Sequence, residues 1–568
     1  MENQRTFLFI ALMAIGAVLF QKWIDFTDPV QSQTADSSSV VEAQQGVPGD
    51  IPTIEQANIN TDQDIPVVDV NVAAKPQTSD LDQIGAMTSG SYITVETDMI
   101  IAKINTAGGA LESVKLKKEP VSLEKPDQGF PLLTKTANDI FITQDGLAAT
   151  NKQAPSHRSE YNSDKTDYAL NGADSIIVPL RWKADNGTEF VKTYRFRQGS
   201  YLIDVDYQID NQSGSDWVGI HYGSLLRTAD SDSGSSFGRL PSHTGPAYYT
   251  QEEKYDKITF DDMEDEALNQ KTADGWVAML QHYFVAAWVP EKGNKAFDTR
   301  IKTLDGKKIY EIRYQSKDTT VVPAGQVGHV SSRLYIGSKE QRLLKAAEEQ
   351  DGINGLALTV DYGFLTFIAD PLFTVLSWIH NVIGNWGWSI ILLTVLIKAV
   401  FYPLSAASYK SMAGMKKLQP RIKTLKERYK EDKPKFQAEM MALYKKEKIN
   451  PAGGCLPILI QIPVFISLYW ALLESVEIRL APFALWWQDL SAPDPYYVLP
   501  VLMGLSMWAQ QKLNPAPMDD IQKKVMAIMP IALTFLFLTF PQGLVLYWVV
   551  NNVLSMAQQW FINKRHAT

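Results

Sequence analysis

The chain has 568 residues, a length that suits several domains rather than one, and it carries a net charge of −9. Its composition is 45% hydrophobic and 21% charged overall, but the long apolar runs lie mainly in the last third. A polar part is therefore joined to a membrane part, which excludes a purely cytosolic enzyme, and the single cysteine excludes a disulfide-stapled domain or a cysteine-rich zinc site.

The first predicted element is an apolar run over residues 6–20. A secretory signal peptide has a similar core, but no small-x-small cleavage site follows this one. Extended to Ile24, the run is just long enough to cross a bilayer. We predict an uncleaved transmembrane signal anchor over residues 1–24, with its N-terminus inside. Residues 25–90 are rich in Gln, Ser, Asp and Pro, which predicts a flexible, acidic linker.

Short runs of alternating apolar and polar residues begin near Tyr92 and continue to Tyr335. Two examples are residues 189–196 (EFVKTYRF) and 201–207 (YLIDVDY). Alternation with a period of two, interrupted by Gly, Asn and Asp, is typical of strands joined by turns. The sequence predicts an all-β sandwich domain over residues 91–350, with a helix at its end.

An amphipathic helix is predicted next, within residues 351–385. Its apolar residues follow at spacings of three and four: Leu365, Ile368, Leu372, Leu376, Ile379 and Ile383. A polar stripe on the other face suits a helix that lies in the membrane interface. The alternative is a packed helix of the soluble domain. Pro371 is expected to bend either version.

Residues 386–568 contain five further apolar spans, at 386–402, 455–473, 497–508 with its flanks, 525–540 and 543–562. Together with the anchor they make six transmembrane helices. If successive spans cross the membrane in alternate directions from an inside N-terminus, the large β domain lies outside. The basic loop that follows the span at 386–402 then lies inside. The 512–524 loop and the Lys564-Arg565 tail fall inside as well, as the positive-inside rule requires.

The basic loop at residues 404–450 carries 13 basic and five acidic residues, a net charge of +8. Its apolar residues step by three and four on each side of Asp432 and Pro434: Met415, Leu418, Ile422, Leu425 and Tyr429, then Phe436, Met440 and Leu443. This spacing predicts an antiparallel helical hairpin on the cytoplasmic side. The charges are either its solvated faces and a topology signal, or a docking surface for ribosomal RNA or lipid head groups.

One charged residue interrupts the spans. Lys398 lies in the first of the five, where a Lys at the centre of a helix costs about 2.5–3.5 kcal/mol on insertion scales. Thr394 lies on the same face. Lys398 either snorkels to the interface or faces a wet cavity. Polar residues of other spans, such as Gln461, Asn552 and Ser555, either hold helices together or line that cavity.

Several long motifs carry a resemblance to a known family. They are 402–404 (YPL), 418–420 (LQP), 439–444 (EMMALY), 450–455 (NPAGGC), 461–463 (QIP), 481–486 (APFALW), 494–497 (DPYY) and 543–548 (GLVLYW). In these motifs the chain resembles the YidC membrane-protein insertases of Gram-negative inner membranes. The start of the chain and the β domain also resemble the Gram-negative members, so the resemblance covers nearly the whole chain.

The resemblance implies a five-helix insertase core, a periplasmic β-supersandwich, and a hydrophilic groove that holds a cationic residue. Lys398 stands where many members of the family carry Arg. Lysine keeps the positive charge but lacks the planar guanidinium that can bind a carboxylate with two hydrogen bonds. The implied substrate groove consists of Lys398, Thr394, Gln461, Tyr547, Trp548, Asn552 and Ser555. The implied substrate slide consists of Ile458, Ile462, Phe465 and Phe535. No catalytic or metal-binding residue is expected.

The expected function is a membrane protein insertase and chaperone that moves nascent transmembrane segments into the inner membrane, alone or with the Sec translocon. The expected partners are nascent inner-membrane proteins, the Sec translocon, the ribosome and the lipid bilayer, with no small-molecule substrate. Hydrophobic burial drives the step, so no ATP site or cofactor is expected, and no GxxxxGK[ST] or HExxH motif occurs.

Three other functions compete with this expectation. The first is a translocon-associated scaffold or chaperone without insertase activity of its own. The second is a secondary transporter that binds an anionic solute at Lys398, although five core spans do not divide into two equal repeats. The third is a carbohydrate-acting enzyme on a membrane anchor, suggested by the relation that the resemblance implies between the β domain and sugar-binding folds.

Overall fold

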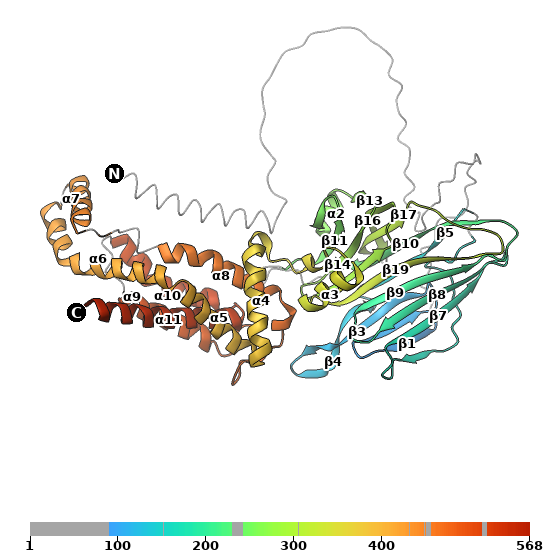
Figure 1. Cartoon of the computed structure of the whole chain (residues 1–568), viewed down its shortest axis with the longest axis horizontal. Helices are drawn as coiled ribbons and strands as arrows, with labels where there is room; N and C mark the ends of the chain where they lie inside the picture. The colour runs from blue at the N-terminus through green and yellow to red at the C-terminus, as the bar shows by residue number, and fades with distance from the viewer. Residues whose placement is uncertain are drawn as a thin grey trace, which may run out of the picture. The chain divides into compact units, whose positions relative to one another are not determined.

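The computed structural model describes residues 90–150, 153–229, 242–304, 306–430, 432–447, 449, 456–513 and 520–567. The predicted anchor at 1–24 and the predicted linker, except its last residue, lie outside these ranges. The described residues fall into two compact units, one formed by residues 413–449 and the other by the rest. The larger unit begins with a domain of β-strands and continues into helices (Figure 1).

The strands form two sheets, and within each sheet the described neighbouring strands pair antiparallel, except β1 and β6, which pair parallel. Within the described residues, the first sheet has the order β13 (Asn269–Thr272), β16 (Lys295–Leu304), β17 (Lys307–Ser316), β10 (Trp217–Thr228), β5 (Ile140–Ala149), β4 (Lys125–Lys135), β3 (Ala110–Ser122), β2 (Ile100–Asn105), β1 (Tyr92–Glu96) and β6 (Asp167–Ala169), with β18 (Thr320–Val322) beside β10. The second has the order β12 (Lys254–Lys257), β11 (Gly245–Thr250), β14 (Gly275–Leu280), β15 (Phe284–Pro290), β19 (Val327–Ser338), β9 (Leu202–Asp210), β8 (Glu189–Arg197) and β7 (Ser175–Lys183).

The two sheets pack face to face, and β8 shows how the sequence produces this. Its alternation buries Phe190, Lys192, Tyr194 and Phe196 on one face. The buried Lys192 donates from Nζ to Asp145 Oδ1 of β5 in the other sheet, at 2.6 Å. A fully buried charge is tolerated only when it is paired, so this ion pair fixes how the two sheets face each other.

The helices are α2 (Phe260–Asp265), α3 (Gln341–Asp351), α4 (Thr366–Ile383), α5 (Trp386–Val400), α6 (Tyr402–Arg428), α7 (Lys433–Lys446), α8 (Leu456–Glu474), α9 (Val498–Leu513), α10 (Asp520–Phe537) and α11 (Gln542–Ala567), with short 3₁₀ turns η1 (Leu356–Thr359), η2 (Gly363–Leu365) and η4 (Val476–Ile478). The prediction of a β-rich domain followed by a helical region is confirmed. Each of the five core spans predicted from the sequence contains a helix: α5, α8, α9, α10 or α11.

Length and apolar composition test whether these helices could cross a bilayer. Among the described residues only one helix, Gly363–Ile383, qualifies alone, and it corresponds to the predicted interfacial helix. It is continuous through Pro371. The helices α5 and α6 qualify only as a pair, with a bend of 68° between them, and α8 is apolar but shorter. The count of six spans therefore stays a prediction.

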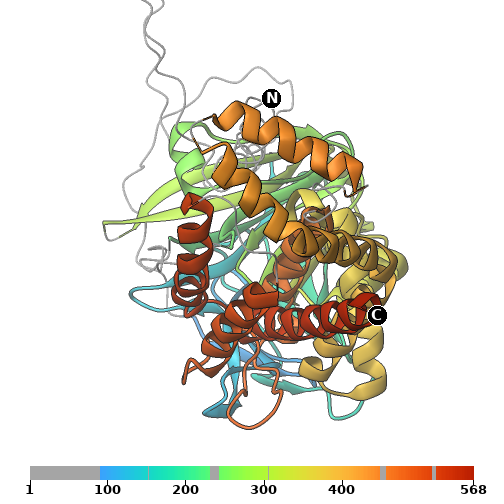
Figure 2. The ribbon, with the colours of Figure 1, turned by 90° about the vertical axis from the view of Figure 1, so that its left-hand side faces the viewer.

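The helical part of the larger unit is held together around α11, the red helix that ends beside the C mark in Figure 2. It contacts α5, α8 and α9, while α4 contacts α5 and α8. Large apolar side chains also point outward from these helices, for example Leu396 of α5, Ile531 and Phe535 of α10, and Trp560 of α11. Outward apolar faces of this extent mark surfaces that meet lipid or an apolar partner rather than water.

The smaller unit contains the C-terminal part of α6 and the whole of α7, within the segment where the sequence predicts a helical hairpin. Leu418 and Ile422 of α6 form a buried apolar cluster with Met440 and Tyr444 of α7. The Asp432 side chain accepts a hydrogen bond from Lys435 N at 3.0 Å and so caps the start of α7. The apolar stripes of both helices are thus used against each other, and the basic residues lie outside this cluster.

Candidate functional site

The charge predicted within the first core span lies inside the helical part of the larger unit. Lys398 of α5 is 3% exposed. Its Nζ donates to Ser555 Oγ of α11 at 2.8 Å and lies 3.4 Å from Gln461 Oε1 of α8. Among the described residues, no carboxylate lies within 4.0 Å of Nζ. Three helices therefore surround a cation with neutral oxygen atoms, and we call Lys398, Gln461 and Ser555 the Lys398 cluster.

Two further side chains touch the backbone of α5 near this cluster. The Thr394 hydroxyl, one turn before Lys398, donates to Ile390 O at 2.6 Å, so its donor is satisfied by its own helix. Gln558 Nε2 of α11 lies 3.5 Å from Lys398 O. That carbonyl belongs to the last turn of α5, where no intrahelical partner follows. Gln558 was not among the predicted site residues, although its place one turn from Ser555 could have indicated it.

The polar residues of α11 do not all join the cluster. Asn552 is buried, but its Nδ2 donates to Ser506 Oγ of α9 at 2.9 Å. Gln559 Nε2 lies 3.4 Å from Leu513 O, also of α9. Ser555 therefore contacts Lys398, whereas Asn552 contributes to the contact between α11 and α9. Ser506 was missed by the sequence reasoning because α9 carries no other mark of a site.

Aromatic rings form the apolar side of the region. Trp548 packs edge-on against Phe465 of α8, with ring centroids 4.5 Å apart, and against Phe537 of α10 at 5.2 Å. Tyr547 is buried, with its ring 6.1 Å from that of Phe465. These rings join α8, α10 and α11. The sequence reasoning did not find Phe537, which is one of two Phe residues in α10.

The predicted slide residues differ in exposure. Phe535 of α10 is 70% exposed and Ile462 of α8 is 42% exposed, whereas Phe465 is half-buried under Trp548. Ile458 lies in the first turn of α8, and its side chain lies outside the described set. An apolar helix could therefore contact Ile462 and Phe535 without any rearrangement of the protein.

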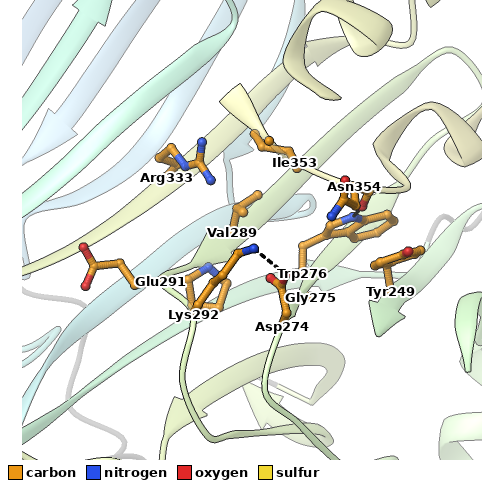
Figure 3. Close-up of a pocket in the computed structure, with 12 residues that line it drawn as sticks. Tyr249, Asp274, Gly275, Trp276, Val289, Glu291, Lys292, Arg333, Ile353 and Asn354 are labelled. Carbon is orange, nitrogen blue, oxygen red and sulfur yellow. Dashed lines mark hydrogen bonds and ion pairs between the residues drawn. The ribbon is translucent and has the colours of Figure 1, made fainter. Parts of the chain in front are cut away.

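A pocket in the β domain was considered as an alternative site (Figure 3). Three of its charged side chains already have partners: Lys292 Nζ lies 3.2 Å from Asp274 Oδ2, and Arg333 donates to Asp351 O. Its Trp276 stacks on Tyr249. Within the described ranges, no three His, Cys, Asp or Glu residues gather as a metal site. The Lys398 cluster is the better candidate, because the Lys398 ammonium has no acidic partner among the described residues.

Comparison with known proteins gave matches along the whole chain. Residues 92–375 match a family model described as YidC periplasmic domain, and residues 378–568 match one described as 60Kd inner membrane protein. A membrane protein insertase YidC of Nitrosococcus oceani is 44% identical over 574 residues, covering 100% of this chain and 99% of the relative.

Two more matches complete the comparison. A membrane protein insertase YidC of Methylobacillus flagellatus is 45% identical over 568 residues and covers 99% of this chain and 97% of its own length. A crystal structure of an active YidC insertase with its first transmembrane domain resolved is 18% identical, with a TM-score of 0.36. The match covers 83% of this chain and 92% of that one.

Proposed function

Because the chain belongs to the YidC family of membrane protein insertases, we propose how its own residues carry out insertion. The protein is a membrane protein insertase and not an enzyme in the catalytic sense. It is an inner membrane protein with a periplasmic β domain. The proposal concerns the route that a nascent transmembrane segment takes, and it assigns the polar part of this route to the Lys398 cluster.

A single observation carries the proposal: Lys398 is buried and lacks an acidic partner among the described residues. A nascent protein with a polar, often acidic tail must pass a layer in which charge is costly. A carboxylate that reaches Lys398 forms a charge-assisted hydrogen bond, which is stronger than a bond to a neutral amide. The 3.4 Å contact with Gln461 is longer than the 2.8 Å contact with Ser555. We therefore expect the incoming carboxylate to displace Gln461.

The substrate's own apolar helix follows a second path. Ile462 and Phe535 present exposed apolar surface on α8 and α10, as a slide requires. Moving a span of about 20 apolar residues from water into lipid releases about 25 cal/mol per Å² of buried surface, so insertion needs no nucleotide. The membrane potential adds about 2.3 kcal/mol per charge per 100 mV for an acidic tail that moves outward.

Topology and partners are part of the same proposal. Six spans with both termini in the cytoplasm put the basic hairpin inside and the β domain outside, in agreement with the positive-inside rule. The packing of α6 on α7 buries Leu418 and Met440 and leaves Lys416, Lys417 and Lys423 exposed. Such a surface suits the ribosome or anionic lipid head groups. The Sec translocon is a further proposed partner.

The test is insertion into liposomes that contain the purified protein and no translocon. The substrate is a single-span protein with an acidic N-terminal tail, and protection of the tail from protease is measured. Lys398→Ala is expected to lose most protection and Lys398→Arg to keep it, whereas Lys410→Ala, at an exposed lysine of α6, serves as the matched control. For a substrate with an uncharged tail, protection should be the same in wild type and in Lys398→Ala.

Three other outcomes would contradict the proposal. Equal insertion by wild type and Lys398→Ala would remove Lys398 from the mechanism. Insertion no better than in empty liposomes would favour a translocon-dependent scaffold or chaperone. An equal loss with acidic and uncharged tails would show that Lys398→Ala damages the fold rather than the route.

A further inference from the structure

The segment that follows α8 joins the helical part to the β domain. At its start Glu474 lies 3.8 Å from Lys339 Nζ and 3.7 Å from His282 Nε2, both of the β domain. At its end Arg479 Nη2 donates to Pro120 O and Val121 O, near the end of β3, at 2.8 and 3.1 Å. We call residues 474–479 and these partners the junction. It is polar and largely buried, which is unusual for a simple linker.

Carboxyl groups outnumber cations in one half of the junction. Glu477 of η4, Glu119 of β3 and Glu340 before α3 interact with one another electrostatically. Arg479 lies 3.8 Å from Glu119, and its guanidinium lies 5.5 and 5.7 Å from the ring centroids of Phe130 and Phe284, which stack on each other. Glu340 has its own exposed partner, Arg342, at 3.1 Å. Arg479 is thus the cation beside Glu119, whereas Glu477 has no cationic nitrogen within 4.0 Å among the described residues.

Glu477 is the more constrained of the two inner carboxyls. Its Oε1 accepts a hydrogen bond from Gln341 N at 3.0 Å, at the start of α3. Its Oε2 is buried and accepts no hydrogen bond from the described residues. Burying a carboxylate oxygen that has no hydrogen-bond donor costs more free energy than burying a neutral carboxylic acid. The reason is that loss of water penalises the charged form more than the neutral one. The docked geometry therefore favours the protonated form of Glu477.

We propose that Glu119 and Glu477 form a proton-dependent clasp, which holds the β domain on the C-terminal end of α8 when both are protonated and loosens when they ionise. The clasp goes beyond the insertion route, because it concerns the attachment of the β domain. It also bears on that route, since α8 carries Gln461, Ile462 and Phe465. The position of the end of α8 then depends on whether the clasp is closed.

The direction of the pH dependence follows from proton uptake. Burial, followed by the charges of Glu340 and Glu119, raises the pKa of Glu477 from 4.5 to about 7. Burial also raises the pKa of Glu119 to about 7, against the effect of Arg479. The docked state thus binds more protons than the released state between pH 4.5 and about 7. Docking is strongest at acidic pH and weakens as the pH rises through this window.

Other charged groups at the junction do not reverse this direction. Lys339 and Glu474 face the other end of the segment and form an ion pair there. His282 Nε2 lies 2.9 Å from Leu473 O and near Glu474, so protonation of His282 also favours docking. The glutamate variants separate its contribution from that of the clasp, because they leave His282 intact.

The clasp can be tested by a distance measurement on the full chain in lipid nanodiscs. Spin labels are attached in a Cys455→Ser background at Leu123→Cys, which is 47% exposed in the β domain, and at Tyr496→Cys, which is 68% exposed before α9. The distribution of distances is recorded from about pH 5.5 to 8.5. We expect a narrow distribution at low pH, which widens as the pH rises toward about 7 and changes little above it.

Variants determine whether the two carboxyls are responsible. Glu119→Gln with Glu477→Gln imitates the fully protonated state and should keep the distribution narrow at every pH, whereas Glu477→Gln alone should keep the part of the response that Glu119 supplies. Glu349→Gln removes an exposed carboxyl of α3 and should leave the wild-type response unchanged. A wild-type distribution that does not change with pH overturns the proposal without any variant. A double variant that still responds to pH overturns it as well, and a further loss of the response in His282→Gln would then assign the effect to that histidine.

Discussion

The ammonium of Lys398 donates to the hydroxyl of Ser555 at 2.8 Å, and this hydroxyl donates in turn to Asn551 O at 2.7 Å. The direction of both hydrogen bonds is therefore fixed, because a lysine can only donate and the carbonyl can only accept. Ser555 therefore accepts the hydrogen bond from Lys398 and donates its own hydroxyl proton to a carbonyl of its own helix. A hydroxyl held in this way positions a cation without neutralising it.

The first prediction concerns this pair. Ser555→Ala should lower the free energy of unfolding in detergent by about 1.5–3 kcal/mol, the range for a hydrogen bond to a charged group. In a Lys398→Met background the same change should cost much less, since the bond is already gone. Ser506→Ala, which breaks the contact with Asn552, is the control, and it should add independently to Lys398→Met. Equal costs of Ser555→Ala in both backgrounds would show that the two side chains are not coupled.

The second prediction concerns the buried pair in the β domain. Asp145→Asn leaves Lys192 with a buried, uncompensated charge and should destabilise the domain by about 3–5 kcal/mol. Glu189→Gln breaks the exposed pair with Lys183 and should cost far less, because solvent screens an exposed ion pair. Urea unfolding of the intact chain, followed by tryptophan fluorescence, measures both. Similar losses for the two variants would mean that burial does not decide the energy of this ion pair.

The alternation of β8 was visible in the sequence, but the partner of its buried lysine was not. Lys192 falls on the same face as Phe190 and Tyr194 by its spacing alone. Whether a charge on that face is buried depends on Asp145, which lies in a different sheet. A strand pattern gives the face of a residue and not what lies opposite, so the ion pair between the sheets required the structure.

The candidate site was predictable to a similar extent. Lys398 stands out because a charge is rare in an apolar span, and Gln461 and Ser555 stand out as polar residues in such spans. Asn552 was grouped with Ser555 because the two are three residues apart. A spacing of three turns the side chain by about 60° around the helix, and Asn552 reaches α9 instead. The rotation of each helix against its neighbours depends on packing, which a single-helix pattern does not contain.

The third prediction is an acid-dependent loss of stability in the β domain. His243 Nε2 lies 3.2 Å from Pro246 O, where the neutral ring can donate. Burial, followed by the charge of Lys257, lowers the pKa of His243 from 6.5 to about 4. Between these values the unfolded chain binds a proton that the folded domain does not, so stability falls as the pH falls.

His243→Gln keeps a donor but does not titrate, so it should remove this part of the pH dependence. The measurement compares the free energy of unfolding of the β domain at about pH 7 and 5, and the variant should lose less than wild type. His329→Gln, at a histidine whose side chain is 58% exposed, is the control. If wild type and His243→Gln lose the same free energy between these pH values, His243 is not the group that titrates.

The last prediction uses two phenylalanines of one helix. Phe535 is 70% exposed on α10, whereas Phe537, two residues later, is 3% exposed and packs against Trp548. A substrate helix that slides along α10 can touch the first ring and not the second. A photo-crosslinking benzophenone residue at position 535 should therefore react with a nascent transmembrane segment, and one at position 537 should react with the insertase itself.

The same comparison can be made on α8, where Ile462 is 42% exposed and Leu468 is fully buried. Crosslinks at both 462 and 535 would place the substrate against α8 and α10. A single substrate helix of about 10 Å diameter is wide enough to touch adjacent faces of two helices. Crosslinks at 537 or 468 of equal yield would mean that the substrate opens the aromatic contact between Phe537 and Trp548. In that case insertion would pass between the helices rather than along them, and the slide would have to be abandoned.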